Sequence, residues 1–183
     1  MNAANPLYAL SPFFIAFVFS FPQSGTASGW REPEDLFKFV NTTEKIWVYN
    51  SSELSNALCK EDVMDHINKK KDDYYFNRTI YTTDKRNSSA YLWGLVFQNK
   101  MLVGPPGTGP NTTEELLYQN ENSTCGVFDV AFAGKYFGWY EIRVWNSSLE
   151  EGPSKDCVEH FTNHTQRRNQ TIFTGCAQML LLR

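Results

Sequence analysis

The sequence contains no apolar stretch that is long enough to cross a membrane as a helix. Such a helix needs about 20 consecutive apolar residues, whereas the most apolar block is confined to residues 13–21. Small residues follow this block, and Gly25-Thr26-Ala27 is typical of a signal-peptide cleavage site. We therefore expect residues 1–27 to be a secretory signal peptide, residues 28–183 to form a single domain, and the protein to be extracellular.

The sequence also lacks the motifs of catalysis and metal binding. It has three histidines and four cysteines, with no Cys-x-x-Cys and no Cys/His pair at ligand spacing, and no nucleophile elbow. The loop Gly104–Pro110 is rich in proline and does not end in Lys-Ser/Thr, as a phosphate-binding loop would. A net charge of −3 argues against nucleic-acid binding. We expect no enzymatic activity, no metal, no cofactor, and neither nucleic acid nor membrane as a partner.

Cysteine is scarce, and all four residues follow the predicted signal peptide. An even number in an oxidising compartment indicates two disulfides, and three pairings are possible.

Asparagine, in contrast, occurs mostly at the start of one kind of triplet. Of the 13 Asn residues after Ala27, nine begin an Asn-x-Ser/Thr triplet, the acceptor for N-linked glycans. The predicted glycosylation sites are Asn41, Asn50, Asn77, Asn87, Asn111, Asn122, Asn146, Asn163 and Asn169.

Short segments rich in β-branched and aromatic residues recur along the chain and predict strands. The predicted strands are Ile46–Tyr49, Tyr74–Thr82, Ala90–Phe97, Gly126–Phe132, Tyr136–Trp145 and Thr171–Cys176. Helices are predicted at Glu32–Val40, where Pro33 and acidic residues suit a first turn, and at Pro153–Asn163. Because no β-α-β alternation occurs, the pattern predicts a mainly β domain, either an antiparallel barrel or a sandwich, with one or two packed helices.

The most informative segment is the predicted hairpin between Cys125 and Cys157. Successive side chains of a strand point to opposite faces. The second strand therefore has Trp139, Glu141, Arg143 and Trp145 on one face, and Tyr140, Ile142 and Val144 on the other. If the charged face lines a cavity, it is a binding site, and if it faces water, it is an ordinary solvated surface. On the strand at Tyr74–Thr82, a glycan on Asn77 must point outward, which turns Phe76 and Arg78 inward.

In this order of features the mature chain resembles the tick salivary lipocalins, the group that includes histamine-binding proteins. The resemblance covers the predicted helix at Leu36-Phe37, the segment Lys45–Tyr49 and the four cysteines. Its most specific part is a pattern associated with amine binding: Cys-Asp-(Val/Ile/Leu), then Glu-Leu-(Trp/Tyr), then Cys. Here Cys125-Gly126-Val127 and Glu141-Ile142-Arg143 are separated by 13 residues, and 13 more precede Cys157. Gly126 replaces the Asp of the pattern, and Arg143 replaces its aromatic residue.

The resemblance implies an eight-stranded antiparallel lipocalin-type barrel with a short N-terminal helix and a C-terminal helix packed on its wall. It also implies the disulfides Cys59–Cys176 and Cys125–Cys157. Barrels of this strand number can enclose one small ligand. The function that follows is a secreted, monomeric protein that sequesters a small host mediator. The alternative is a secreted protein that binds a host protein through its loops, with Gly104–Pro110 as the natural surface.

Two classes of small ligand remain open. Glu141 supplies a carboxylate for a biogenic amine such as histamine or serotonin. A buried ion pair with Arg143, however, would leave this carboxylate little electrostatic attraction for an ammonium. If Arg143 is free in a cavity, it suits the carboxylate of a lipid such as a leukotriene, with aromatic side chains around the apolar tail. The predicted ligand-binding residues are Glu141, Arg143, Trp139, Trp145, Phe128, Trp93, Phe76 and Trp47.

Overall fold

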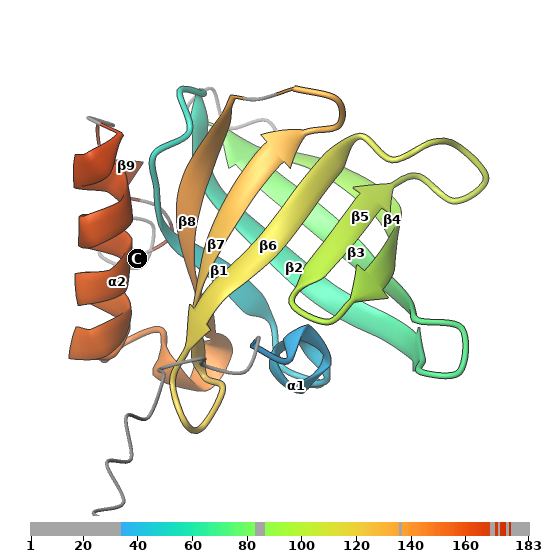
Figure 1. Cartoon of the computed structure of the whole chain (residues 1–183), viewed down its shortest axis with the longest axis horizontal. Helices are drawn as coiled ribbons and strands as arrows, with labels where there is room; N and C mark the ends of the chain where they lie inside the picture. Colours follow the sequence, from blue (N-terminus) through green and yellow to red (C-terminus); the bar gives the residue numbers. More distant parts are fainter. Residues whose placement is uncertain are drawn as a thin grey trace, which may run out of the picture. The chain divides into compact units, whose positions relative to one another are not determined.

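An antiparallel β-sheet that closes on itself dominates the computed structural model, which describes residues 34–82, 87–135, 137–168, 171, 173–174 and 176 (Figure 1). The neighbours run in the order β2-β3-β4-β5-β6-β7-β8-β1, and β1 also pairs with β2, where Ile46 lies opposite Asp62. This pairing closes the eight-stranded barrel. The predicted signal peptide and Asn169 lie outside the described residues.

The strands follow one another along the chain with short connections. They are β1 (Ile46–Ser51), β2 (Ala57–Asn68), β3 (Asp73–Thr82), β4 (Asn87–Phe97), β5 (Lys100–Gly104), β6 (Thr112–Gln119), β7 (Cys125–Phe132), β8 (Gly138–Trp145) and the short β9 (Phe173–Thr174), which pairs with β1. The helices are α1 (Leu36–Val40), the 3-10 helix η1 (Asn146–Ser148) and α2 (Lys155–Arg167). Among the described residues, none of the helices has the length and apolar character that a membrane span requires.

Helix α1 covers one end of the barrel (Figure 1). The Asp35 side chain accepts a hydrogen bond from the Lys38 backbone amide and so caps the first turn. Leu36 and Phe39 are fully buried in the interior core, and the Leu36 amide donates to the Gln98 carbonyl in the turn between β4 and β5. This end of the barrel is therefore closed by apolar packing.

Helix α2 packs on the outside of the barrel wall formed by β6, β7 and β8 (Figure 1). Phe161 and Cys157 are buried in a second core, together with Val127 and Ile142 from the wall. The disulfide Cys125–Cys157 joins β7 to α2. The disulfide Cys59–Cys176 joins β2 to Cys176, which follows β9 in the chain. Both pairings implied by the family resemblance are thus confirmed.

Three strands, β2, β5 and β6, were not predicted from the sequence. Strand β2 has charged residues on both faces, with Lys60 and Asp62 turned inward and Glu61 turned outward, so no apolar alternation marks it. Strand β6 has a register shift between Leu116 and Tyr118, which interrupts its alternation. The predicted C-terminal helix, Pro153–Asn163, begins two residues before α2, because Ser154 is the N-cap of α2. It also ends four residues before α2 does.

Candidate functional site

The inner face of β8 carries an acid and a base in the barrel interior. Glu141 is 0% exposed and Arg143 is 2% exposed. The residues of the opposite face, Tyr140, Ile142 and Val144, pack in the core beneath α2. The hairpin therefore turns its charged side chains into the protein and its apolar side chains toward a helix, which reverses the usual arrangement of a half-buried strand.

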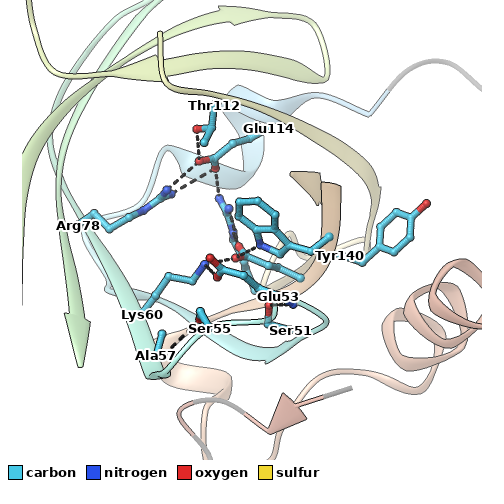
Figure 2. A network of polar contacts seen from close by, with 12 residues as sticks. Ser51, Glu53, Ser55, Ala57, Lys60, Arg78, Thr112, Glu114 and Tyr140 are labelled. Atoms are coloured by element: carbon cyan, nitrogen blue, oxygen red, sulfur yellow. Dashed lines mark hydrogen bonds and ion pairs between the residues drawn. The ribbon is translucent and has the colours of Figure 1, made fainter. Parts of the chain in front are cut away.

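Four strands supply charged side chains to one continuous network in this interior (Figure 2). Arg78 on β3 donates from Nε to Asp62 Oδ1 at 2.7 Å and from Nη1 to Glu114 Oε1 at 2.8 Å. Arg143 continues the network, with Nη1 lying 2.6 Å from Glu114 Oε2 and Nη2 lying 2.7 Å from Glu141 Oε2. Each guanidinium thus bridges two carboxylates, which is the geometry that a planar fork of donors favours.

Lys60 on β2 connects this network to the end of the barrel that lies opposite α1. Its ammonium pairs with Glu141 and lies 2.7 Å from Oε2 of Glu53, in the loop after β1 (Figure 2). Trp139 also donates from Nε1 to Glu141 Oε1 at 2.8 Å. The Glu53 side chain is 23% exposed, so Glu53 is the most accessible carboxylate of the network.

Two buried carboxylates of the network, Glu114 and Glu141, stay ionised at neutral pH. Burial raises the pKa of Glu114, but the guanidiniums of Arg143 and Arg78 outweigh it and lower the pKa to about 2. Burial likewise raises the pKa of Glu141, and Lys60 and Arg143 bring that pKa well below its usual range. The interior is therefore held together by opposite charges, and not by shared protons.

Most of the aromatic residues predicted to bind a ligand pack against this network or against α1. The Arg143 guanidinium lies 4.2 Å from the ring centroid of Phe128, and the Arg78 guanidinium lies 5.3 Å from that of Phe76. Trp145 donates from Nε1 to the carbonyl of Phe39 in α1 at 3.0 Å. In the described structure these rings are thus packing partners of the protein's own groups.

Two predicted residues, Trp47 and Trp93, lie on the outer face of the barrel. Trp47 is the cross-strand neighbour of Val144, on the side of the wall that faces outward, and donates to Asn146. Trp93 is the cross-strand neighbour of Tyr75 and donates to Asp73 at 2.8 Å. Strand parity places both rings away from the interior, so they do not join the charged network with the other predicted ligand-binding residues.

The interior around Gly126 is filled. A Cβ atom at this position would lie 3.0 Å from Leu116 Cδ1, 3.0 Å from Phe39 Cε2 and 3.1 Å from Phe128 Cε2. The missing aspartate of the amine-binding pattern is therefore matched by close packing, into which a side chain would fit only if its neighbours moved. Next to α1, the side chains of Phe39, Leu116 and Phe128 thus pack closely around Gly126.

Space is present at the opposite end of the barrel, where β1 and β7 end and β8 begins. An open pocket of about 680 Å³ lies there, lined by Ser52, Glu53, Leu54, Phe132, Lys135, Phe137, Gly138, Trp139 and Thr171. Trp139 is the one predicted site residue in this lining, and its ring lies 5.3 Å from that of Phe132. Among the described residues, no group of three or more His, Cys, Asp or Glu is arranged to hold a metal ion.

Comparison with known proteins identifies the architecture. No protein-family model matches the chain, and no curated protein matches its sequence. The crystal structure of the AM182 serotonin complex superimposes with a TM-score of 0.61 at 15% identity, over 79% of this chain and 90% of that chain. The siderocalin Ex-FABP superimposes with a TM-score of 0.54 at 8% identity, over 73% of this chain and 88% of that one. The chain has the lipocalin fold. This agrees with the fold that the family resemblance implied.

Sequence reasoning missed several members of the charged interior: Glu53, Lys60, Asp62 and Glu114. Lys60 and Asp62 belong to β2, which was not predicted, and Glu114 belongs to β6, which was not predicted either. One signal was present for Arg78, because an outward Asn77 requires its neighbour to face inward. No such signal marks the charged residues that were missed as inward-facing, since an alternating charged segment is usually a solvated loop or edge strand.

Proposed function

We propose that this lipocalin is a secreted binding protein of the tick salivary type, and that it captures a small amine at the open end of its barrel. The observation that carries the proposal is the pocket beside Glu53 and Trp139, which joins an accessible carboxylate to aromatic walls. An ammonium needs a fixed carboxylate and benefits from aromatic faces, while the rest of a small ligand needs apolar surface.

The charge balance of the network itself favours a cation over an anion, although Lys135 in the pocket lining adds one positive charge beside it. Glu53, Asp62, Glu114 and Glu141 contribute four negative charges, and Lys60, Arg78 and Arg143 contribute three positive charges, which leaves one negative charge. Lys60 is shared between two carboxylates, so Glu53 is the group with the least compensation. An ammonium that pairs with Glu53 would complete the balance without disturbing the buried members.

This site differs from the one that the sequence pattern suggested. Glu141 is occupied by Lys60, Arg143 and Trp139, and a side chain at Gly126 would crowd Phe39, Leu116 and Phe128. We therefore propose that Glu53 takes the role of the amine-binding carboxylate and that Trp139 and Phe132 contact the apolar body of the ligand. Serotonin, which the similar AM182 structure contains, has this combination of an ammonium and an aromatic ring.

A titration of the purified mature protein with serotonin, histamine and a long-chain fatty acid, followed by tryptophan fluorescence, tests the proposal. Trp139 in the lining supplies the signal. Glu53→Gln is expected to weaken amine binding roughly tenfold to a hundredfold, because one charged contact is lost. Glu150→Gln removes an exposed carboxylate elsewhere and is the matched control. Tighter binding of the fatty acid than of either amine, or equal amine affinity for both variants, would contradict the proposal.

A second candidate function is favoured by the rim of the same pocket. Leu54 is 86% exposed and Phe137 is 81% exposed, an unusual amount of apolar surface for two neighbouring loops. A host protein that docks on this rim would use the barrel as a scaffold. The double substitution Leu54→Ser with Phe137→Ser should then abolish binding of the host protein, whereas amine affinity should change little if the two functions are separate.

A further inference from the structure

The outer face of β3 places a predicted glycan acceptor beside two aromatic rings. Asn77 is exposed on this strand, and Thr79, the hydroxyl residue of its triplet, lies on the same face. Tyr91 on β4 is the direct cross-strand partner of Asn77, and Tyr75 precedes Asn77 by two residues on the same face. Cross-strand partners have Cβ atoms about 5 Å apart, so both rings lie within reach of a sugar attached to Asn77.

The ring of Tyr91 is held in place across the strand. Its hydroxyl donates to Oδ2 of Asp65 at 2.8 Å. Tyr91 belongs to β4 and Asp65 to β2, and β3 runs between them, so the side chain crosses the outer surface of β3 next to Asn77. The Tyr91 ring is stacked with that of Tyr75 at 6.1 Å, and Tyr75 is stacked on His66 at 4.3 Å. Tyr91 is nevertheless 43% exposed, which leaves aromatic surface uncovered.

Among the other acceptors in the described part of the chain, Asn87 also has an aromatic cross-strand partner, Tyr81, and Asn146 accepts a hydrogen bond from Trp47. Asn41, Asn87, Asn111, Asn122, Asn146 and Asn163 are also exposed, whereas Asn50 is half-buried. At Asn77 the acceptor is flanked by one aromatic residue on its own strand and by another on the neighbouring strand, and the second is anchored through its hydroxyl. This arrangement offers a surface for the sugar itself and not merely for its attachment.

We propose that the first N-acetylglucosamine on Asn77 packs against the rings of Tyr91 and Tyr75, so that this glycan is part of the folded structure and stabilises the barrel. The apolar C–H face of the sugar would cover the ring surface that is now exposed, with contacts of the kind that aromatic faces make with C–H groups. The proposal rests on passage through the secretory pathway, which is part of the proposed function, but not on any ligand.

The attachment is an ordinary transfer. A bond forms between Nδ2 of Asn77 and the anomeric carbon of the oligosaccharide, and the bond from that carbon to a lipid diphosphate donor breaks. The lipid diphosphate leaves, and the amide nitrogen loses one proton. No oxidation or reduction is involved, and Oδ1 of the asparagine remains an acceptor.

The test uses the full chain secreted from eukaryotic cells. Glycopeptide mass spectrometry measures the occupancy of Asn77, and chemical denaturation measures the folding equilibrium constant of four proteins: the parent, Asn77→Gln, Tyr91→Ala and the double variant. Asn77→Gln is expected to lower the folding equilibrium constant roughly fivefold in the parent. It should have little effect when Tyr91 is already alanine, since the sugar then has no ring to cover.

Two matched variants separate this effect from general effects of glycans and of exposed rings. Asn163→Gln removes an exposed acceptor on α2, and Phe97→Ala removes an aromatic ring that is 53% exposed at the far end of β4. Neither should couple to Asn77→Gln. Enzymatic trimming of the glycans to the first sugar should preserve the stabilisation. An unoccupied Asn77 in the secreted protein, or an equal loss from Asn77→Gln with and without Tyr91, would overturn the proposal, whatever the outcome of the amine titration.

Discussion

Arg143 and Glu141, two residues apart on one strand, form a buried ion pair in which Nη2 lies 2.7 Å from Oε2. Their side chains are 3% and 1% exposed, so neither charge is compensated by water. A buried charge that loses its partner is far more damaging than a surface charge, because the desolvation penalty remains while the attraction disappears. The pair therefore ties the stability of the barrel to its interior charges.

Replacing Arg143 with methionine is expected to destabilise the protein strongly. The substitution leaves Glu141 without one of its cationic partners and Glu114 with Arg78 as its remaining guanidinium. We expect the free energy of unfolding, measured by urea denaturation, to fall by about 3–5 kcal/mol. Arg168→Met is the control, because Arg168 is 42% exposed in its pair with Asp129, and its loss should be below about 1 kcal/mol. Equal effects of the two variants would show that the buried network is not a major source of stability.

The same network predicts a loss of stability in acid. The folded-state pKa of Glu114 is depressed, so its contribution is complete above the unfolded pKa and is lost as the pH falls through the folded pKa. The loss falls between about pH 4.5, the ordinary pKa of a glutamate, and about pH 2, the folded-state pKa of Glu114. Unfolding free energies measured by denaturation over this range should fall steadily, and Glu114→Gln should reduce the slope. Glu150→Gln should keep the parental slope, and a parental curve that is flat over this range would refute the prediction.

A side chain at Gly126 should strain the closed end of the barrel. With contacts of 3.0 Å to Phe39 and Leu116, a methyl group fits only if these side chains move by a few tenths of an ångström. Gly126→Ala is expected to cost about 1–3 kcal/mol through overpacking, and Gly126→Asp more, because it also buries a carboxylate. The midpoint of thermal unfolding measures both effects. Gly109→Ala is the control, since nothing lies within 4 Å of a Cβ atom there.

The disulfide between β7 and α2 should contribute through the loop that it closes. Cys125 and Cys157 are separated by 32 residues. Replacing both with serine is expected to lower the unfolding free energy by roughly 3–4 kcal/mol on the chain-entropy model. Faster hydrogen exchange of the α2 amides, relative to those of β3, would show that the helix is released from the wall. Unchanged protection of α2 would mean that the Phe161 core is sufficient to hold it.

Part of the site could be predicted because its signals are local. The alternation from Trp139 to Trp145 determines which side chains share a face, whatever the partner strands are. The outward Asn77 likewise indicated that Arg78 faces inward. The alternation could not predict which of the two faces of β8 meets the barrel interior. The apolar face is buried under α2, and burial under a helix requires apolar side chains just as burial in a barrel interior does.

The amino-acid sequence alone determined the strand-rich character, the alternation on β8, the predicted acceptor triplets and, through family resemblance, the lipocalin barrel with its disulfide pairing. Only the tertiary structure decided that Arg143 and Glu141 are neutralised by Glu114 and Lys60, and that an open pocket lies beside Glu53. The reason is that these charges come from strands far apart in the chain, and which of them meet depends on barrel closure and register. Neither of these is encoded in the spacing of nearby residues.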